Sequence, residues 1–205
     1  ISVSRRGPVI LPRRVQRWVP YARISYHLKD AVRVAEDGMF WKHDGVDYQQ
    51  IKESMEVNLE RGEFARGAST ITQQLAKNLY LSPSKNPVRK LRELLIARRL
   101  EAELTKQRIY ELYLNVIEWG DGIYGAEAAA RRYFGKSPDK LTVGEAALLA
   151  GLLQAPSRYA PTVNLAGARA RAGTVIERMV TAGYLTPSQA SQVRLDRIAI
   201  REAPI

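Results

Sequence analysis

The chain has 205 residues, 45% of them hydrophobic, and no low-complexity tract, so it is long enough to bury the core of one compact domain. It has no cysteine and only two histidines, which excludes disulfides, thiolate metal sites and a cysteine nucleophile and argues against a multi-histidine metal site. Its formal net charge of +11 favours a polyanionic partner, such as an anionic lipid surface, nucleic acid or a phosphorylated substrate, without choosing among them.

Residues 1–17 form a basic arm that carries five arginines and is followed by Trp18. This composition suits a surface arm near anionic lipid headgroups, and it suits a plain solvated tail equally well. The longest apolar run, residues 146–153, is far shorter than the roughly 20 residues that a transmembrane helix needs. Because the sequence opens at Ile1 without a methionine, we expect a processed or trimmed form whose leader or anchor lies outside these residues.

The first predicted helix runs from a Ser25 cap to Glu36, with an apolar stripe on one face. Residues 37–45 then break the helix and leave Glu36 in its last turn. There the negative end of the helix dipole and nearby aromatic rings would raise the pKa of its carboxyl group, which is how a general base is tuned. The alternative is an ordinary exposed glutamate at a helix end.

A second helix is expected to begin at Asp47, which forms a capping box with Gln50, and to end near residue 60 before Gly62. Its apolar stripe is narrow, consisting of Ile51, Met55 and Leu59. A narrow stripe followed by glycine and by an aromatic ring between cations indicates a mobile lobe at an interface over residues 46–66. A poorly packed surface hairpin is the alternative.

The stretch after Gly67 is rich in polar groups at helical spacing. Ser69 is predicted to cap a helix on which Thr70, Gln74 and Lys77 share one face. An amide and an ammonium group beside a helix N-terminus suit an oxyanion such as a phosphate, although a solvated polar face has the same pattern.

A further helix is predicted to start near Pro87. On it Glu93 is followed at helical spacing by three apolar residues, Ala97, Leu100 and Leu104. The carboxylate therefore leaves the apolar face of the helix and needs a partner, and Arg89 and Lys90 are within reach. Two interpretations stay open: a structural ion pair, and a charged group lining the pocket of a charged substrate.

Helices are also predicted for the second half of the chain. A run over residues 104–119 has core positions at Ile109, Leu112, Tyr113 and Val116. An alanine-rich helix over residues 124–133 follows a turn at 121–122. Capping boxes precede a buried helix through Leu153 and a last short helix, at Thr142–Glu145 and Thr186–Gln189. Because few runs alternate with period two, the fold is predicted to be all-α, with residues 194–205 as an extended tail.

Residues 82–85 match the S-x-x-K motif of penicillin-binding serine acylases. They lie in a proline-rich turn, and neither S-D-N nor K-T-G follows, so we interpret them as a loop.

Five blocks of residues, in order, carry a resemblance to a known family. They are Glu36-Asp37-x-x-Phe40-x-x-His43-x-Gly45, residues 67–78, Arg89-Lys90-x-x-Glu93, residues 106–115 and residues 124–136. Together they resemble the motif blocks of the peptidoglycan glycosyltransferases of glycosyltransferase family 51, over residues 18–161. The Trp18-Val19-Pro20 opening is similar to the monofunctional biosynthetic transglycosylases, but the glycosyltransferase domain of a class A penicillin-binding protein would look much the same.

The resemblance implies an all-α, lysozyme-like helical domain at residues 18–193, with the smaller mobile lobe at 46–66 beside the active-site cleft. It implies polymerisation of lipid II into β-1,4 glycan strands, with inversion and release of polyprenyl pyrophosphate. The implied location is the outer, periplasmic face of the bacterial cytoplasmic membrane. The implied partners are lipid II, the polyprenyl-pyrophosphate-linked chain, the membrane surface and other cell-wall synthesis or division proteins, and not nucleic acid.

By this similarity Glu36 is the general base for the acceptor 4-hydroxyl, and Glu93 assists the pyrophosphate end directly or through Mg²⁺ or Mn²⁺, with no cofactor obligatory. The other implied substrate-binding residues are Asp37, Phe40, His43, Ser69, Thr70, Gln73, Gln74, Lys77, Asn78, Lys85, Arg89 and Lys90. Family members often have arginine at the position of Lys85, and lysine keeps the charge but loses the bidentate fork.

Two other functions are weighed against this one. A lysozyme-like glycoside hydrolase or lytic transglycosylase would also place two carboxylates in a cleft, but it would need no cations for a pyrophosphate. A basic helical nucleic-acid-binding module would account for the net charge and leave Glu36 and Glu93 unexplained.

Overall fold

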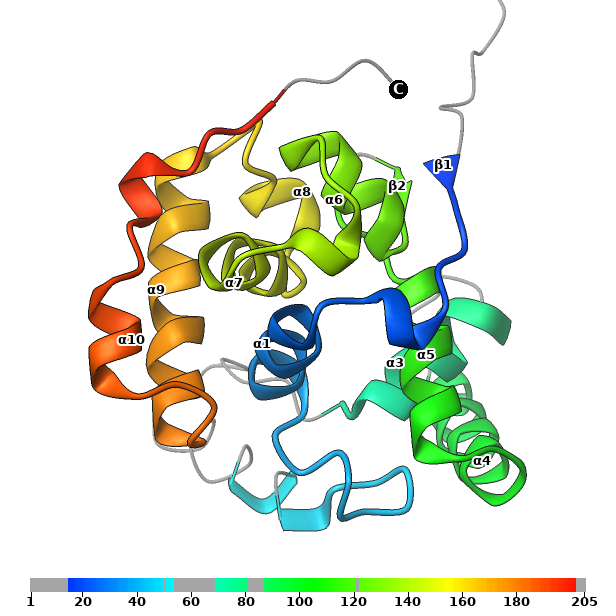
Figure 1. Ribbon diagram of the computed structural model, residues 1–205. Coiled ribbons are helices and arrows are strands. Elements are labelled where there is room, and N and C mark those ends of the chain that lie inside the picture. The colour runs from blue at the N-terminus through cyan, green and yellow to red at the C-terminus, as the bar shows by residue number, and fades with distance from the viewer. Residues whose placement is uncertain (1–14, 50, 54–68, 81–86, 121, 202–205) are drawn as a thin grey trace, which may run out of the picture.

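The computed structural model describes residues 15–49, 51–53, 69–80, 87–120 and 122–201, which fold mainly into helices as predicted. Helix α1 (Tyr26–Glu36) lies at the centre (Figure 1). On one side it packs against α7 (Val143–Leu152) and α9 (Leu165–Thr181), which also pack against each other. The all-α fold class is therefore confirmed.

A second group of helices lies on the other side of the molecule (Figure 1). It consists of α3 (Ile71–Tyr80), α4 (Pro87–Glu103) and α5 (Lys106–Val116). Within this group α3 packs against both α4 and α5. The space where α3 approaches the end of α1 holds most of the residues that the sequence singled out.

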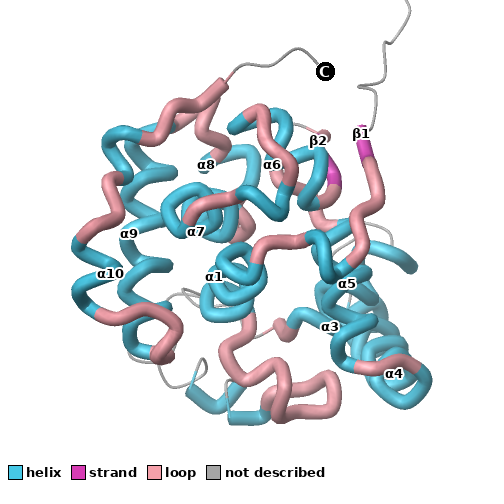
Figure 2. The backbone as a smooth tube through the Cα atoms, in the orientation of Figure 1, coloured by secondary structure: helices cyan, strands magenta, loops and turns pink. Residues whose placement is uncertain are grey.

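Short elements complete the fold. They are η1 (Tyr21–Arg23), α6 (Ala126–Phe134), η2 (Pro138–Lys140), α8 (Pro156–Tyr159), α10 (Pro187–Ser191) and η3 (Leu195–Arg197). The strands named in the described part of the chain are β1 (Val15–Gln16) and β2 (Ile123–Tyr124), shown in magenta in Figure 2. They pair in parallel, with Val15 opposite Ile123 and Gln16 opposite Tyr124.

Helix α1 forms as the sequence predicts. The side chain of Ser25 caps it by accepting a hydrogen bond from the backbone N–H of His27. Leu28, Ala31 and Val32 are buried, so the predicted stripe faces the core. The helix ends because Asp37 has left the helical region, with φ −160° and ψ 80°, and Glu36 is its last residue.

The cap of α3 differs from the prediction. Thr70, not Ser69, is the capping residue: its hydroxyl accepts from the N–H of Gln73 at 3.2 Å, and Gln73 Oε1 accepts from the N–H of Thr70 at 3.1 Å. The Thr70 hydroxyl also donates to the carbonyl oxygen of Gly45 at 2.7 Å, which fixes it in the core. Ser69 is thereby left free to use its hydroxyl elsewhere.

Two predicted helix boundaries were wrong. The run over residues 104–119 is broken before α5, because the side chain of Thr105 caps a new helix by accepting from the N–H of Arg108 at 3.2 Å. At the other end Ile117 is extended and closes α5. Tyr124 belongs to β2 and not to the helix that follows, because it pairs with Gln16, a partner more than 100 residues away.

The C-terminal region holds more structure than predicted. Helix α9 was not predicted, although its buried residues recur at helical spacing: Ala168, Ala172, Val175, Ile176 and Met179. Residues 194–201, predicted as part of an extended tail, contain η3, and Leu195 and Ile198 pack against the core. The N–H of Arg201 donates to the carbonyl oxygen of Tyr133 at 2.8 Å.

Some predictions fall outside the described residues. These are the basic arm up to residue 14, the S-x-x-K turn with Lys85, and most of the lobe at 46–66, including Met55 and Gly62. Residues 48–49 and 51–53 are helical, which agrees with a helix starting after Asp47. In the part of the chain that the structure describes, no helix has the length and apolar character needed to cross a membrane.

Candidate active site

A continuous path of contacts joins Glu36 on α1 to Glu93 on α4. Gln74 Nε2 on α3 donates to Glu36 Oε2 at 2.9 Å and lies 3.4 Å from the carbonyl oxygen of Ser69. The ammonium group of Lys90 donates to the Ser69 hydroxyl at 3.0 Å and is paired with Glu93. The structure therefore brings together a carboxylate, an amide and a cation from three different helices, with the hydroxyl of Ser69 from the segment just before α3.

Glu36 is a partly buried carboxyl group in this path. Burial raises its pKa, while the hydrogen bond from Gln74 and the charges of Arg171 and Arg178 act in the opposite direction, and Asp37 adds to the rise. The direction of the pKa shift is the one that the sequence predicted, and desolvation by burial is its largest cause. A carboxylate with a raised pKa can accept a proton near neutral pH.

Glu93 has different surroundings. Its side chain is only 3% exposed, and it pairs with Lys90 and, at 3.5 Å, with Arg89 Nη1 on the same helix. Lys90 is half exposed, so its ammonium group reaches from the buried carboxylate to the surface. Among the described residues the buried Nε of Arg89 has no hydrogen-bond partner.

Asp37 and His43 hold the start of α3 against the end of α1. Asp37 is buried, and its Oδ2 accepts from the N–H of Ile71, the first residue of α3, at 3.0 Å. His43 Nε2 lies 3.0 Å from both Asp37 oxygens, and His43 Nδ1 accepts from the N–H of Gly45 at 3.1 Å. Since Nδ1 is an acceptor, Nε2 carries the proton and donates to Asp37. These contacts hold the first turn of α3 against the end of α1, and Gln74 on α3 therefore lies beside Glu36.

Three other predicted substrate contacts are buried. Phe40 is fully buried, and its ring packs against that of Tyr110. The ammonium group of Lys106 lies 4.5 Å from the centre of the Phe40 ring. Thr70 and Gln73 are buried in the cap of α3. In this conformation these three side chains offer no surface to a ligand and support the site from within.

The remaining predicted residues lie further along α3 or outside the described part of the chain. Lys77 and Asn78 are exposed in the second half of α3. Lys85 is one of the residues that the structure does not describe. The residues that the structure brings together at the site are thus Glu36, Ser69, Gln74, Arg89, Lys90 and Glu93.

The donor set at Glu93 does not fit a divalent cation. Both carboxylate oxygens face cationic side chains, Oε1 that of Lys90 and Oε2 that of Arg89. Within the described ranges, no three histidine, aspartate or glutamate side chains are grouped so that they could hold a metal ion. Positive charge beside Glu93 therefore comes from the protein's own side chains, Arg89 and Lys90.

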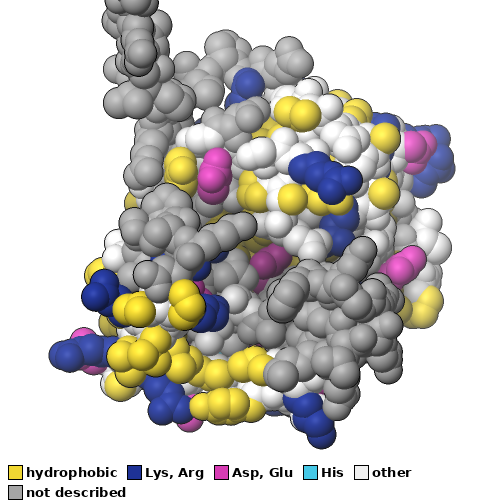
Figure 3. Space-filling view, turned by 180° about the vertical axis from the view of Figure 1, so that it is seen from behind, with side chains coloured by type: hydrophobic (Ala, Val, Ile, Leu, Met, Phe, Trp, Pro, Cys, Tyr) yellow, Lys and Arg dark blue, Asp and Glu magenta, His cyan; other side chains and the backbone are white. Residues whose placement is uncertain are grey.

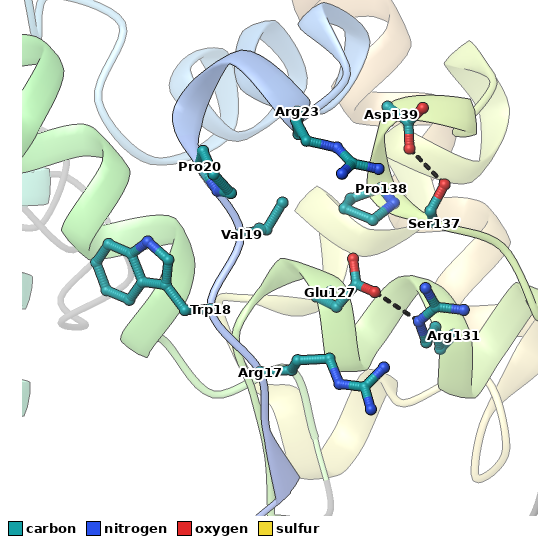
Figure 4. Close-up of a pocket in the computed structure, with 10 residues that line it drawn as sticks. All are labelled: Arg17, Trp18, Val19, Pro20, Arg23, Glu127, Arg131, Ser137, Pro138 and Asp139. Carbon is teal, nitrogen blue, oxygen red and sulfur yellow. Dashed lines mark hydrogen bonds and ion pairs between the residues drawn. The ribbon is translucent and has the colours of Figure 1, made fainter.

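A separate hollow of about 180 Å³ lies near the other end of α1, where the N–H of Ser25 donates to the carbonyl oxygen of Pro138, one of the residues that line the hollow, at 3.0 Å. Figure 4 shows three arginines around it, Arg17, Arg23 and Arg131. Arg131 is paired with Glu127, as the dashed line in Figure 4 indicates. This hollow is remote from Glu36, which is the last residue of α1, and it is not part of the site.

Comparisons with known proteins point to one family. A family model described as "Transglycosylase" matches residues 8–180. A biosynthetic peptidoglycan transglycosylase of Dechloromonas aromatica is 47% identical over 167 residues, which is 82% of this chain and 72% of that protein. One of Aromatoleum aromaticum is 55% identical over 142 residues, 69% of this chain and 62% of that protein. The chain thus spans only part of the length of these relatives.

A solved structure is similar in fold as well as in sequence. The crystal structure of penicillin-binding protein 1A from Haemophilus influenzae matches with a TM-score of 0.55 and 25% sequence identity. The match covers 91% of this chain and 18% of that chain. Nearly all of this chain is therefore similar to one part of a much longer protein.

Proposed function

Because this chain belongs to the transglycosylase family, the peptidoglycan glycosyltransferases of glycosyltransferase family 51, we propose that it polymerises lipid II into β-1,4 glycan strands. The reaction proceeds with inversion and releases polyprenyl pyrophosphate. The observation that carries the proposal is the path from Glu36 through Gln74, Ser69 and Lys90 to Glu93, because it places a proton acceptor near a fixed cation.

Glu36 acts as the general base. It takes the proton of the acceptor sugar's 4-hydroxyl as that oxygen forms a bond to the anomeric carbon of the donor. The bond between the anomeric carbon and the pyrophosphate oxygen breaks, and its electron pair leaves with the pyrophosphate. The raised pKa of Glu36, caused by burial, favours holding the transferred proton.

The cations of α4 meet the departing pyrophosphate. Negative charge grows on this group in the transition state, so positioned cations stabilise the transition state more than the ground state. The half-exposed ammonium group of Lys90 and the partly exposed guanidinium group of Arg89 supply positive charge, and Glu93 holds both side chains in place. Lys77 and Lys85 are further cations that we assign to this role.

These cations also favour the synthase over its competitor. A glycoside hydrolase or lytic transglycosylase cleaves a sugar–sugar bond and has no pyrophosphate to neutralise. A nucleic-acid-binding module would use the net charge but would leave the buried contacts of Glu36 and Glu93 without a role.

Incubation with lipid II tests the function directly. We expect a ladder of glycan products by gel electrophoresis, and far less product in the same time from the Glu36→Gln variant. Cleavage of preformed glycan without growth on lipid II would favour the hydrolase. Retardation of DNA that weakens with salt, without glycan products, would favour the nucleic-acid module.

We also propose that this synthesis takes place on the outer face of the cytoplasmic membrane, with α4 toward the lipid. Helix α4 exposes an apolar stripe at helical spacing, Val88, Leu91 and Leu95, each more than half exposed. Leu79 and Tyr80 at the end of α3 are also exposed. Figure 3 shows hydrophobic side chains gathered on this part of the rear face, with basic side chains next to them. Apolar groups beside cations suit the interface of an anionic membrane.

Serine substitutions at Leu91 and Leu95 test the membrane contact. We expect weaker binding to vesicles containing anionic lipid, and a greater loss of activity on full-length lipid II than on a short-chain analogue. Val163→Ser is the matched control, because Val163 is just as exposed but precedes α9 on the other side of the molecule. Equal losses on both substrates, or unchanged vesicle binding, would contradict the proposed lipid contact.

A further inference from the structure

The side-chain amide of Gln74 lies between three groups whose hydrogen-bonding roles differ. Its Nε2 faces two acceptors, Glu36 Oε2 at 2.9 Å and the carbonyl oxygen of Ser69 at 3.4 Å. Its Oε1 accepts from the hydroxyl of Tyr113 at 3.0 Å. A glutamine amide can turn by 180° about its last bond, which exchanges its donor and acceptor ends. Its neighbours therefore decide which end Glu36 meets.

We propose that Tyr113 is a positioning residue, whose hydroxyl holds the Gln74 oxygen and thereby keeps the Gln74 NH₂ group directed at the Glu36 carboxylate. The inference rests on the proposed role of Glu36 as the base. If the amide were turned, its oxygen would face both the Glu36 carboxylate and the Ser69 carbonyl, and three acceptors would meet without a proton between them.

The surroundings of Tyr113 suit this role. It is fully buried on α5, which packs against α3. Its ring stacks on that of Tyr110, with the two ring centres 6.4 Å apart. Burial raises the pKa of its hydroxyl well above the usual value, so the group keeps its proton and stays a donor. A buried side chain makes no contact with substrate, so Tyr113 acts through Gln74.

The hydrogen bond from Gln74 favours the charged form of Glu36 and so opposes the effect of burial. The other charged groups that face Glu36 are Arg171 and Arg178 from α9 and the adjacent Asp37, and a substitution at Tyr113 alters none of these three residues. Loss of the oriented NH₂ group then raises the pKa of Glu36 further. Because the base works only when it is ionised, the acid limb of the pH–rate profile moves to higher pH.

Tyr113→Phe tests this, because it removes one oxygen and keeps the ring. We expect a rate loss of about tenfold on the acid side of the profile, which shrinks to less than about threefold above the acid limb. A purely structural role would lower the rate by the same factor at every pH. A uniform loss, or an acid limb at the wild-type position, would overturn the proposal.

Tyr110→Phe is the matched control. Tyr110 lies on the same helix and is as deeply buried, but its hydroxyl donates to the carbonyl oxygen of Lys29 and not to Gln74. We expect its acid limb to stay at the wild-type position, and a shift equal to that of Tyr113→Phe would overturn the proposal.

Gln74→Met gives a second route that does not depend on how well Tyr113→Phe folds. It should move the acid limb of the profile in the same direction. Adding Tyr113→Phe to Gln74→Met should then produce no further shift, since the residue through which Tyr113 acts is gone. Additive shifts would mean that Tyr113 reaches Glu36 independently, which contradicts the proposal.

A direct titration separates this inference from the proposed function. The carboxyl group of Glu36 can be followed by ¹³C NMR, with Glu36→Gln used for assignment, and this needs no turnover. If Glu36 titrates at higher pH in Tyr113→Phe while the wild type makes no glycan, the positioning role stands and the function falls. If the wild type polymerises lipid II and the two titrations coincide, the function stands and the positioning role falls.

Discussion

Glu36 and Glu93 are two carboxylates at the ends of one path of contacts, and their surroundings are opposite in kind. Glu36 has a neutral amide as its hydrogen-bond donor, and burial raises its pKa. Glu93 lies between the cations of Arg89 and Lys90 on its own helix. The cations that act on Glu36 come from α9, and both guanidinium groups also bond to backbone carbonyl oxygens, Arg178 to that of Ala35 and Arg171 to that of Gly151.

This difference indicates how one cleft assigns two roles to the same side chain. A carboxylate that must take up and release a proton is best left without a direct ion pair, because a pair would hold it in the charged form. A carboxylate that must keep two cations in a fixed position is best paired with them.

The largest effect is expected at Glu36. Glu36→Gln keeps the shape of the side chain and removes the proton acceptor, so the polymerisation rate should fall by about 10² to 10⁴. Binding of the donor and the thermal unfolding midpoint should stay close to those of the wild type. A folded Gln variant that polymerises lipid II at a near-normal rate would remove Glu36 from its role as base.

A smaller effect is expected for Lys90, which pairs with Glu93, and for Lys77 on α3. Lys90→Ala and Lys77→Ala should each weaken the binding of a phosphoglycolipid inhibitor by about five- to thirtyfold, because each removes one charged contact to phosphate. Titration of the inhibitor measures this, and Lys140→Ala on η2, at the far end of α1, is the control. If neither Lys90→Ala nor Lys77→Ala changes the affinity, the Glu93 cluster is a structural ion pair only.

The smallest effects are expected in the free energy of unfolding. The Glu→Gln substitutions at the two positions should change it in opposite directions. Glu93→Gln should lower the free energy of unfolding by about 1 kcal/mol, a modest value because Lys90 is exposed to solvent. Glu36→Gln should leave it unchanged or raise it at pH 7, because a neutral amide is easier to bury than a carboxylate. Denaturant titrations of both variants measure the difference.

The stability contribution of Glu36 should also depend on pH. Its pKa is raised in the folded state, so the folded protein binds that proton more tightly than the unfolded chain does. The resulting stabilisation is fully present below the unfolded pKa and is lost as the pH rises through the folded pKa. The advantage of Glu36→Gln over the wild type should therefore grow from acid to neutral pH, and a constant difference would contradict a raised pKa of Glu36 in the folded state.

Several features followed from local sequence alone. The Ser25 cap, the end of α1 at Glu36 and the pairing of Glu93 with Arg89 and Lys90 involve residues at most four positions apart. Helical geometry fixes such neighbours before any tertiary contact forms, so spacing in the sequence is enough to predict them. The order of the motif blocks was likewise visible in the chain and gave the family.

The assembly of the site was decided by the tertiary structure. The contact between Gln74 and Glu36 joins residues 38 positions apart, that between Tyr113 and Gln74 joins residues 39 apart, and that between Lys90 and Ser69 joins residues 21 apart. Tyr113 was predicted as a core residue, which it is, but no spacing rule could show that its hydroxyl reaches Gln74. Hydrophobic periodicity determines which face of a helix is buried and leaves open which residue of another helix that face meets. That choice depends on how α1, α3, α4 and α5 pack together, because only packing brings distant polar groups within hydrogen-bonding distance of each other.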